Sequence, residues 1–150
     1  MDRPFVLFEE SHLGALAATA AVSLILMAIA RIWNNRRLAA PIRWVLAGFL
    51  IAGWALWFVL LYSKGWFSAA TILPMQLCDW AALVTIITLI RPPQRTYELA
   101  YFWALGGTLQ ALLTPDLAID FPDPRFLIFF ALHGGVIASV LFLTLGLRLR

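Results

Sequence analysis

Residues 13–33 read LGALAATAAVSLILMAIARIW, an apolar stretch with no charged side chain before Arg31. About 20 mostly apolar residues are enough for a helix to cross the hydrocarbon core of a bilayer. Four further stretches have the same character, at about 44–62, 68–90, 97–113 and 125–147. The sequence therefore predicts an all-α fold, a polytopic membrane helix bundle of about five transmembrane helices.

The composition of the whole chain agrees with this prediction. Of the 150 residues, 63% are hydrophobic and 13% are charged, and the mean hydropathy is +0.88. Soluble domains average about 45–50% apolar and about 25% charged residues. A soluble globular protein, a disordered chain and a disulfide-rich secreted domain are thus excluded, and residues 1–150 form a single integral-membrane domain. Because Cys78 is the one cysteine, an intrachain disulfide is excluded as well.

Basic residues are distributed unevenly between the two sides of the predicted bundle. Eight lie in the 31–43 loop, the 91–95 loop and the C-terminus, whereas the other side has Arg3, Lys64 and Arg125. The positive-inside rule places the richer side in the cytoplasm. We therefore expect a multi-pass protein of the cell membrane with its N-terminus outside and its C-terminus cytoplasmic. Because the basic residues are explained by this orientation, the net charge of +3 does not indicate a nucleic-acid partner, and none is expected.

Polar side chains are rare in the predicted spans and gather toward the outer side. Asp79 lies eleven residues into its span and His133 eight residues into its own, which is roughly 16 Å and 12 Å at about 1.5 Å per residue. Gln110 and His12 lie near the outer ends of two other spans. An ionisable group at membrane depth costs roughly 2.5–3.5 kcal/mol, so such groups usually face the bundle interior. One polar pocket in the outer half of the bilayer is expected.

Each of these residues also has a structural interpretation. Gln76 and Gln110 are equally consistent with interhelical hydrogen bonding, and a lone Cys78 with a small buried apolar side chain. His12 is equally consistent with an interfacial position. The Thr114-Pro115-Asp116 segment is more typical of a turn than of a lid or a lipid headgroup contact.

Three segments resemble one known family. Residues 73–79 read LPMQLCD, residues 106–116 read GGTLQALLTPD and residues 129–135 read FFALHGG. They resemble segments of the YwaF-like family of bacterial integral-membrane proteins, and the similarity extends from about residue 8 to about residue 147. The 106–116 segment is the most specific. Members of that family tend to continue with at least one more span, so the resemblance implies that this chain is C-terminally truncated or a short form.

The eukaryotic relatives of this largely uncharacterised family include transmembrane protein 164. The resemblance implies an acyltransferase that moves fatty acyl chains between phospholipids, with a cysteine on the helix that corresponds to residues 68–90. It also implies a histidine that corresponds to His133. The expected cysteine position directly after the proline is Met75 here, and the usual histidine at the next position is Gln76. Cys78 lies one turn further along.

Two classes of function follow from these residues. In a lipid-modifying enzyme, the catalytic residues would be Cys78 as nucleophile, His133 as general base and then acid, and Asp79 as the group that orients the imidazole. In a variant of this hypothesis, His133 and Asp79 activate water, and the reaction is lipid hydrolysis. The predicted substrate-binding residues are Gln76, Gln110, Thr114, Asp116 and His12. Membrane lipids are the expected partners, and neither a cofactor nor a metal is expected.

The alternative is a non-enzymatic protein. Asp79 and His133 could bind a small cation, a proton or a polar solute in a transport-related bundle. A structural membrane subunit, in which the polar cluster holds helices together, is the third hypothesis. A homo-oligomer is compatible with each of them.

Overall fold

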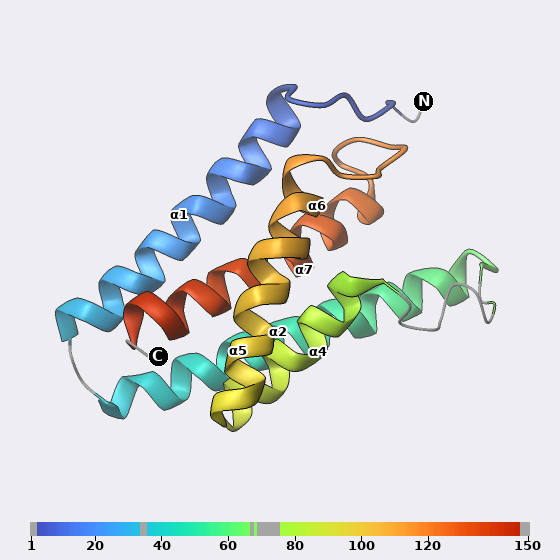
Figure 1. Ribbon diagram of the computed structural model, residues 1–150. Coiled ribbons are helices and arrows are strands. Elements are labelled where there is room, and N and C mark those ends of the chain that lie inside the picture. The colour runs from blue at the N-terminus through green and yellow to red at the C-terminus, as the bar shows by residue number, and fades with distance from the viewer. Residues whose placement is uncertain (1–2, 34–35, 67, 69–75, 148–150) are drawn as a thin grey trace.

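The computed structural model describes residues 3–33, 36–66, 68 and 76–147, with the side chains of residues 33 and 36–38 outside that description. All the regular elements described are helices, and Figure 1 shows their arrangement. In chain order they are α1 (Glu10–Trp33), α2 (Arg36–Ser63), α4 (Leu77–Ile90), α5 (Gln94–Trp103), the π-helix η1 (Ala104–Thr108), α6 (Leu109–Leu113), α7 (Pro124–Leu141) and the π-helix η2 (Phe142–Gly146).

Three of these helical segments are long and apolar enough to cross a membrane. They are Glu10–Ile32, Ala39–Ser63 and Pro124–Gly146, and Leu77–Ile90 is a shorter apolar helix. The prediction of an all-α membrane bundle is confirmed. The stretch predicted at 97–113 is helical from Gln94 to Leu113, with a π-helical turn in its middle. The stretch predicted at 68–90 is described as helix from Leu77 onward, and residues 69–75 lie outside the described residues.

Helix α7 lies at the centre of the bundle. It packs against α1, α2, α4, η1 and α6, and Figure 1 shows it between α1 and α2. Gly134 and Gly135 make this close packing possible, because a Cβ on Gly134 would lie 2.6 Å from Thr19 Oγ1 of α1, and one on Gly135 would lie 2.9 Å from Phe49 Cε1 of α2. Small residues at helix contacts let membrane helices approach closely, where dispersion forces are strongest.

Two arginines satisfy carbonyl groups at helix ends. The last four carbonyls of a helix have no partner within the helix. Arg43 donates from Nε to Leu89 O at 2.7 Å and from Nη2 to Ile90 O at 2.9 Å, so it caps α4. Arg31 donates from Nε to Leu145 O at 3.1 Å in η2. Both belong to the basic side of the bundle, so these charges stabilise helix ends in addition to any influence on orientation.

At the opposite end, the N-terminal segment 3–9, here called the strap, lies along the loop before α7. Pro4 and Ile119 form an antiparallel bridge, Phe5 N–H donates to Ala118 O at 3.2 Å and Asp120 N–H donates to Arg3 O at 2.9 Å. Within that loop, the side chain of Asp123 caps the start of α7 by accepting from Arg125 N–H at 2.8 Å. The strap therefore joins α1 to the start of the central helix.

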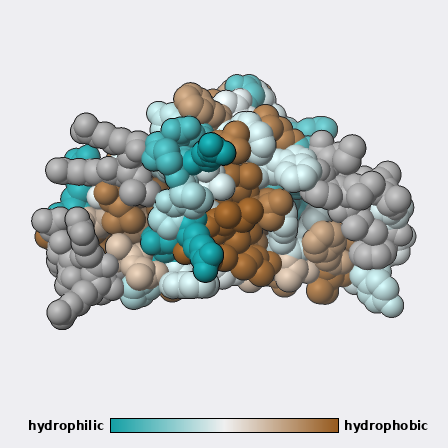
Figure 2. Space-filling model, turned by 60° about the horizontal axis from the view of Figure 1, so that its bottom comes forward, coloured by the Kyte–Doolittle hydropathy of each residue, from teal (hydrophilic) through white to brown (hydrophobic). Residues whose placement is uncertain are grey.

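The outer surface of the bundle is strongly apolar. Ile32 and Val45 are 77% and 70% exposed, and many other large apolar side chains of α1 and α2 are exposed as well. Figure 2 shows hydrophobic side chains gathered over the middle of one face of the molecule, with hydrophilic ones beside them. Contact with lipid chains would remove this surface from water, as expected for a membrane protein.

Candidate functional site

His133 lies on the face of α7 that turns toward α4, η1 and α6. Its neighbours in sequence fix this orientation, because Gly134 faces α1 and Gly135 faces α2. At 3.6 residues per turn, His133 shares its face with Val136 and Ile137, and both of these are buried. The elements that remain in contact with α7 are α4, η1 and α6. The imidazole is therefore directed at the part of the bundle that also carries the predicted polar residues.

One nitrogen of the His133 ring is already engaged. Nδ1 lies 2.8 Å from the carbonyl oxygen of Phe129, one turn earlier in α7. Because a carbonyl can only accept, Nδ1 carries the proton in the neutral ring and Nε2 presents a lone pair. The ring also stacks on Phe129, with centroids 4.0 Å apart at 24°. Both contacts hold the imidazole in one orientation, which is how a general base is positioned.

Cys78 is the second residue of α4 and is half-buried. Beside it lies the side chain of Thr108, the last residue of η1. The Thr108 hydroxyl is buried and has no hydrogen bond of standard geometry among the described residues. A buried hydroxyl without a partner is costly, and π-helical turns are frequent at functional sites. Thr108 lies in the 106–116 segment of the sequence, where no role was predicted for it, and its place beside Cys78 is visible only in the fold.

Asp79 has a different partner from the one predicted. Its Oδ2 lies 3.4 Å from the backbone nitrogen of Gln76, the residue just before α4, as in a helix cap. A carboxylate in the first turn of a helix is also favoured by the helix dipole. The described geometry thus gives Asp79 a place in the cap of α4, next to Cys78. Gln76 itself is exposed, and Pro74 and Met75 lie outside the described residues.

The remaining predicted contacts lie at the end of α6. Gln110 Nε2 donates to Thr114 Oγ1 at 3.0 Å, and Thr114 Oγ1 donates to Gln110 O at 3.1 Å. Both residues and Asp116 are exposed. The pair therefore terminates α6.

His12 is fully buried and has a partner at each ring nitrogen. Nδ1 accepts from Phe8 N–H at 3.0 Å, so the neutral ring carries its proton on Nε2, which lies 2.8 Å from Leu112 O. Its ring also contacts Phe5 and Phe130. His12 thus connects α1 and the strap to the end of α6 through hydrogen bonds, and these contacts stabilise the fold.

A second acidic site lies in the loop before α7. Asp120 is buried. Its Oδ1 accepts hydrogen bonds from Ser11 Oγ at 2.6 Å and from Phe121 N–H at 2.7 Å. Its Oδ2 lies 3.6 Å from Arg3 Nε. Burial by itself would raise the pKa of the Asp120 carboxyl, but these two hydrogen bonds and the Arg3 charge outweigh it and hold the pKa below its ordinary value. The Arg125 side chain, which donates to Asp123 from Nε and Nη2, lowers the pKa of Asp123.

The long apolar helices and the exposed apolar surface define the chain as a helical integral membrane protein. A family model described as the TMEM164 family matches residues 7–150, so the chain belongs to the TMEM164 family. No curated protein and no solved structure gives a significant match. The predicted relationship to transmembrane protein 164 is thereby confirmed.

Proposed function

We propose that this membrane protein transfers acyl groups between lipids, with His133 as its general base and acid. The observation that carries the proposal is the hydrogen bond from His133 Nδ1 to the Phe129 carbonyl, since it leaves Nε2 free on the face toward α4 and η1. Membership of the TMEM164 family and the acyltransferase activity implied by the resemblance support the same chemistry. The closer relationship to YwaF-like bacterial proteins is part of this proposal.

In the proposed reaction, His133 Nε2 takes the proton from the Cys78 thiol. The sulfur attacks the ester carbonyl of a phospholipid, a C–S bond forms, and the C–O bond to the glycerol breaks. The imidazolium returns its proton to the departing glycerol oxygen, which leaves a lysophospholipid. A hydroxyl of an acceptor lysolipid then gives its proton to Nε2 and attacks the thioester carbonyl. The new ester C–O bond forms, the C–S bond breaks, and the imidazolium returns the proton to the Cys78 sulfur.

The neighbours of Cys78 have supporting roles in this proposal. The Thr108 hydroxyl, which lies beside Cys78 without a hydrogen bond of standard geometry, is the proposed donor to the oxygen of the tetrahedral intermediate. One such donor is typically worth about 10²–10³ in rate. Gln76, Gln110, Thr114 and Asp116 are the proposed lipid contacts near the membrane surface. We place this site in the outer leaflet of the cell membrane, with the N-terminus outside, on the charge distribution of the loops.

The test is an acyl-exchange assay in proteoliposomes that contain labelled phosphatidylcholine and an unlabelled lysophospholipid acceptor. His133→Ala is expected to lower the exchange rate at least 100-fold, the lower range for removal of a general base. Thr88→Val is the matched control, since this buried hydroxyl is satisfied by Val84 O at 2.8 Å on the same helix as Cys78. Exchange at the wild-type rate in folded His133→Ala protein would overturn the proposal.

A second variant separates acyl transfer from hydrolysis. Cys78→Ala is expected to abolish exchange if the thioester forms on Cys78. If this variant instead keeps activity that depends on His133 and releases free fatty acid, water is the nucleophile and the acyl-transfer proposal fails.

A further inference from the structure

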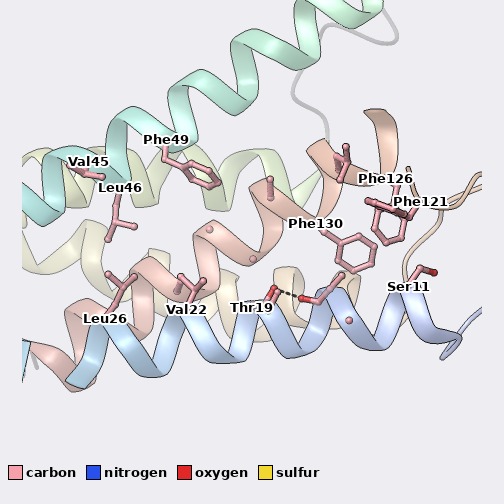
Figure 3. Close-up of a pocket in the computed structure, with 18 of the residues that line it drawn as sticks. Ser11, Thr19, Val22, Leu26, Val45, Leu46, Phe49, Phe121, Phe126 and Phe130 are labelled. Atoms are coloured by element: carbon pink, nitrogen blue, oxygen red, sulfur yellow. Dashed lines mark hydrogen bonds between the residues drawn. The ribbon is translucent and has the colours of Figure 1, made fainter. Parts of the chain in front are cut away.

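A long groove lies on the side of α7 that faces away from His133. Helices α1 and α2 form its walls and α7 forms its floor, and its volume is about 680 Å³. Figure 3 shows Phe126 and Phe130 near one end of the groove and Leu26 and Val45 toward the other. Ala131 lines the groove and lies two residues, or about 200°, from His133 around the helix. The groove is therefore separate from the site proposed above.

One face of α1 supplies most of one wall. Its lining residues recur at helical spacing, from Ser11 through Ala18 and Val22 to Leu26. The floor is made of small residues, among them Gly134 and Ala138. Because small side chains leave the space open and large apolar ones border it, the groove forms a continuous apolar channel along the spanning helices.

The length of the groove suits a single hydrocarbon chain. From Ser11 to Leu26 its lining runs roughly 22 Å at about 1.5 Å per residue. This length covers the half-thickness of roughly 15 Å that one leaflet contributes to the hydrocarbon core.

Polarity is confined to one end of the groove. Glu10 and Ser11 lie there, whereas the rest of the lining is apolar apart from Thr19. The Ser11 hydroxyl donates to Asp120 and the Thr19 hydroxyl to Ala15 O, so both donors are already used. The acidic Glu10 disfavours the carboxylate of a free fatty acid, while the neutral ester region of a phospholipid is compatible with it.

We infer that the groove between α1, α2 and α7 binds one acyl chain of a membrane glycerophospholipid, with the ester end near Ser11 and the chain directed toward Leu26. Such a chain would fill the space beside α7 and bury the apolar lining from Val22 to Phe130 against hydrocarbon. The site is independent of the proposed reaction, because the bound chain lies behind α7 as seen from His133.

Photolabelling tests this inference. The full chain is reconstituted in phosphatidylcholine vesicles that contain a small fraction of phosphatidylcholine with a diazirine in one acyl chain, and labelled positions are mapped by mass spectrometry. Labels are expected to concentrate on the groove face of α1 and on the floor residues of α7. Ala18→Phe, which fills the groove, is expected to lower labelling at those positions at least fivefold.

Ala17→Phe is the matched control, because Ala17 is the exposed neighbour of Ala18 and is outside the groove lining. Its labelling is expected to stay within twofold of the wild type. Ala131→Leu fills the floor of the groove and serves as the second variant if Ala18→Phe does not elute as a folded species. Uniform labelling around α1, or equal losses in the variants at positions 17 and 18, would overturn the inference.

Two further outcomes identify other occupants. Competition by unlabelled oleate but not by added phosphatidylcholine would assign the groove to a free fatty acid and overturn the phospholipid assignment. Efficient bismaleimide crosslinking of the Ala18→Cys variant into a dimer, in a Cys78→Ser background, would place a second copy of the chain there. Absence of both, together with the fivefold loss, supports the inference.

Discussion

The Ser11 hydroxyl donates a 2.6 Å hydrogen bond to the Asp120 carboxylate, across 109 positions of the chain. The same carboxylate oxygen accepts from Phe121 N–H, and the backbone nitrogen of Asp120 donates to Arg3 O. The first turn of α1, the strap and the loop before α7 therefore share one buried acidic group. Loss of that group is expected to loosen all three.

Replacement of Asp120 is expected to destabilise the fold. Asp120→Ala leaves the Ser11 hydroxyl and the Phe121 N–H without their acceptor in a buried place, at a cost of about 1–3 kcal/mol for an unsatisfied group. Thermal unfolding in detergent, followed by circular dichroism, measures the loss. Asp116→Ala is the control, since Asp116 is an exposed carboxylate in the same loop, and an equal effect of the two changes would contradict the assignment.

The stabilisation by Asp120 is expected to depend on pH. Since the pKa of this carboxyl is lower in the folded protein than the ordinary value of about 3.9, its contribution is present above that value. It is lost as the pH falls through the lower pKa of the folded state. The difference in Tm between the wild type and Asp120→Asn should be largest near neutral pH and should shrink below about pH 4. A constant difference from pH 7 to pH 3 would show that the charge is not responsible.

Removal of the His12 side chain is expected to affect stability. His12→Ala deprives Phe8 N–H and Leu112 O of their partners and removes ring contacts with Phe5 and Phe130, so a loss of about 2–4 kcal/mol is expected. Detergent unfolding gives this loss, and the KM for lipid in folded protein tests the substrate-binding role that the sequence suggested. A raised KM with unchanged stability would favour that role over the structural one.

Alanine substitutions at the two adjacent glycines of η1 are expected to differ in their effect on stability. A Cβ on Gly107 would lie 2.8 Å from Leu77 Cδ2, whereas one on Gly106 would have no heavy atom within 4 Å. Gly107→Ala should therefore displace the half-exposed Leu77 side chain, at a cost of about 0.5–1.5 kcal/mol for an off-rotamer conformation, and Gly106→Ala should be neutral or stabilising. If Leu77 is the obstacle, Leu77→Ala should partly rescue Gly107→Ala in a double-mutant cycle.

The Thr108 hydroxyl is expected to matter for activity more than for stability. Thr108→Val removes a buried hydroxyl that has no standard hydrogen bond, so stability should be unchanged or improved. If the hydroxyl stabilises the tetrahedral intermediate, kcat for acyl exchange should fall about 10²–10³-fold with little change in KM. Thr108→Ser should restore the rate, and an equal rate in Thr108→Val would remove Thr108 from the mechanism.

The long apolar helices could be predicted from the sequence because the bilayer imposes a length on every spanning helix. The predictions at 13–33 and 125–147 correspond to spans in α1 and in α7 with η2. The sequence also predicted that the bundle has one basic end, and the contacts agree with it. Arg31 and Arg43 cap helices at that end. The hydrogen bonds of Ser11 and His12 lie at the opposite end. The π-helical turn at Ala104–Thr108 had no sequence signal, because it depends on how η1 packs against α4 and α7.

The partners of the polar residues could not be predicted in the same way. The sequence placed Asp79 and His133 at similar depth and suggested that they interact, yet the structure joins Asp79 to the backbone of Gln76 and His133 to Phe129. Depth follows from counting residues along a helix. Partners depend on how each helix is rotated about its axis and on which helices meet.

The sequence by itself determined that this chain is a helical membrane protein with a few polar residues at membrane depth, because hydrophobic length and charge placement are properties of the chain alone. Only the tertiary structure decided that His12 and Asp120 are buried and hydrogen-bond to distant segments. It also decided that Thr108 lies beside Cys78 without a standard hydrogen bond, and that a groove runs along the side of α7 opposite His133. The physical reason is that burial, hydrogen-bond satisfaction and cavity shape are set by contacts between segments up to 109 residues apart.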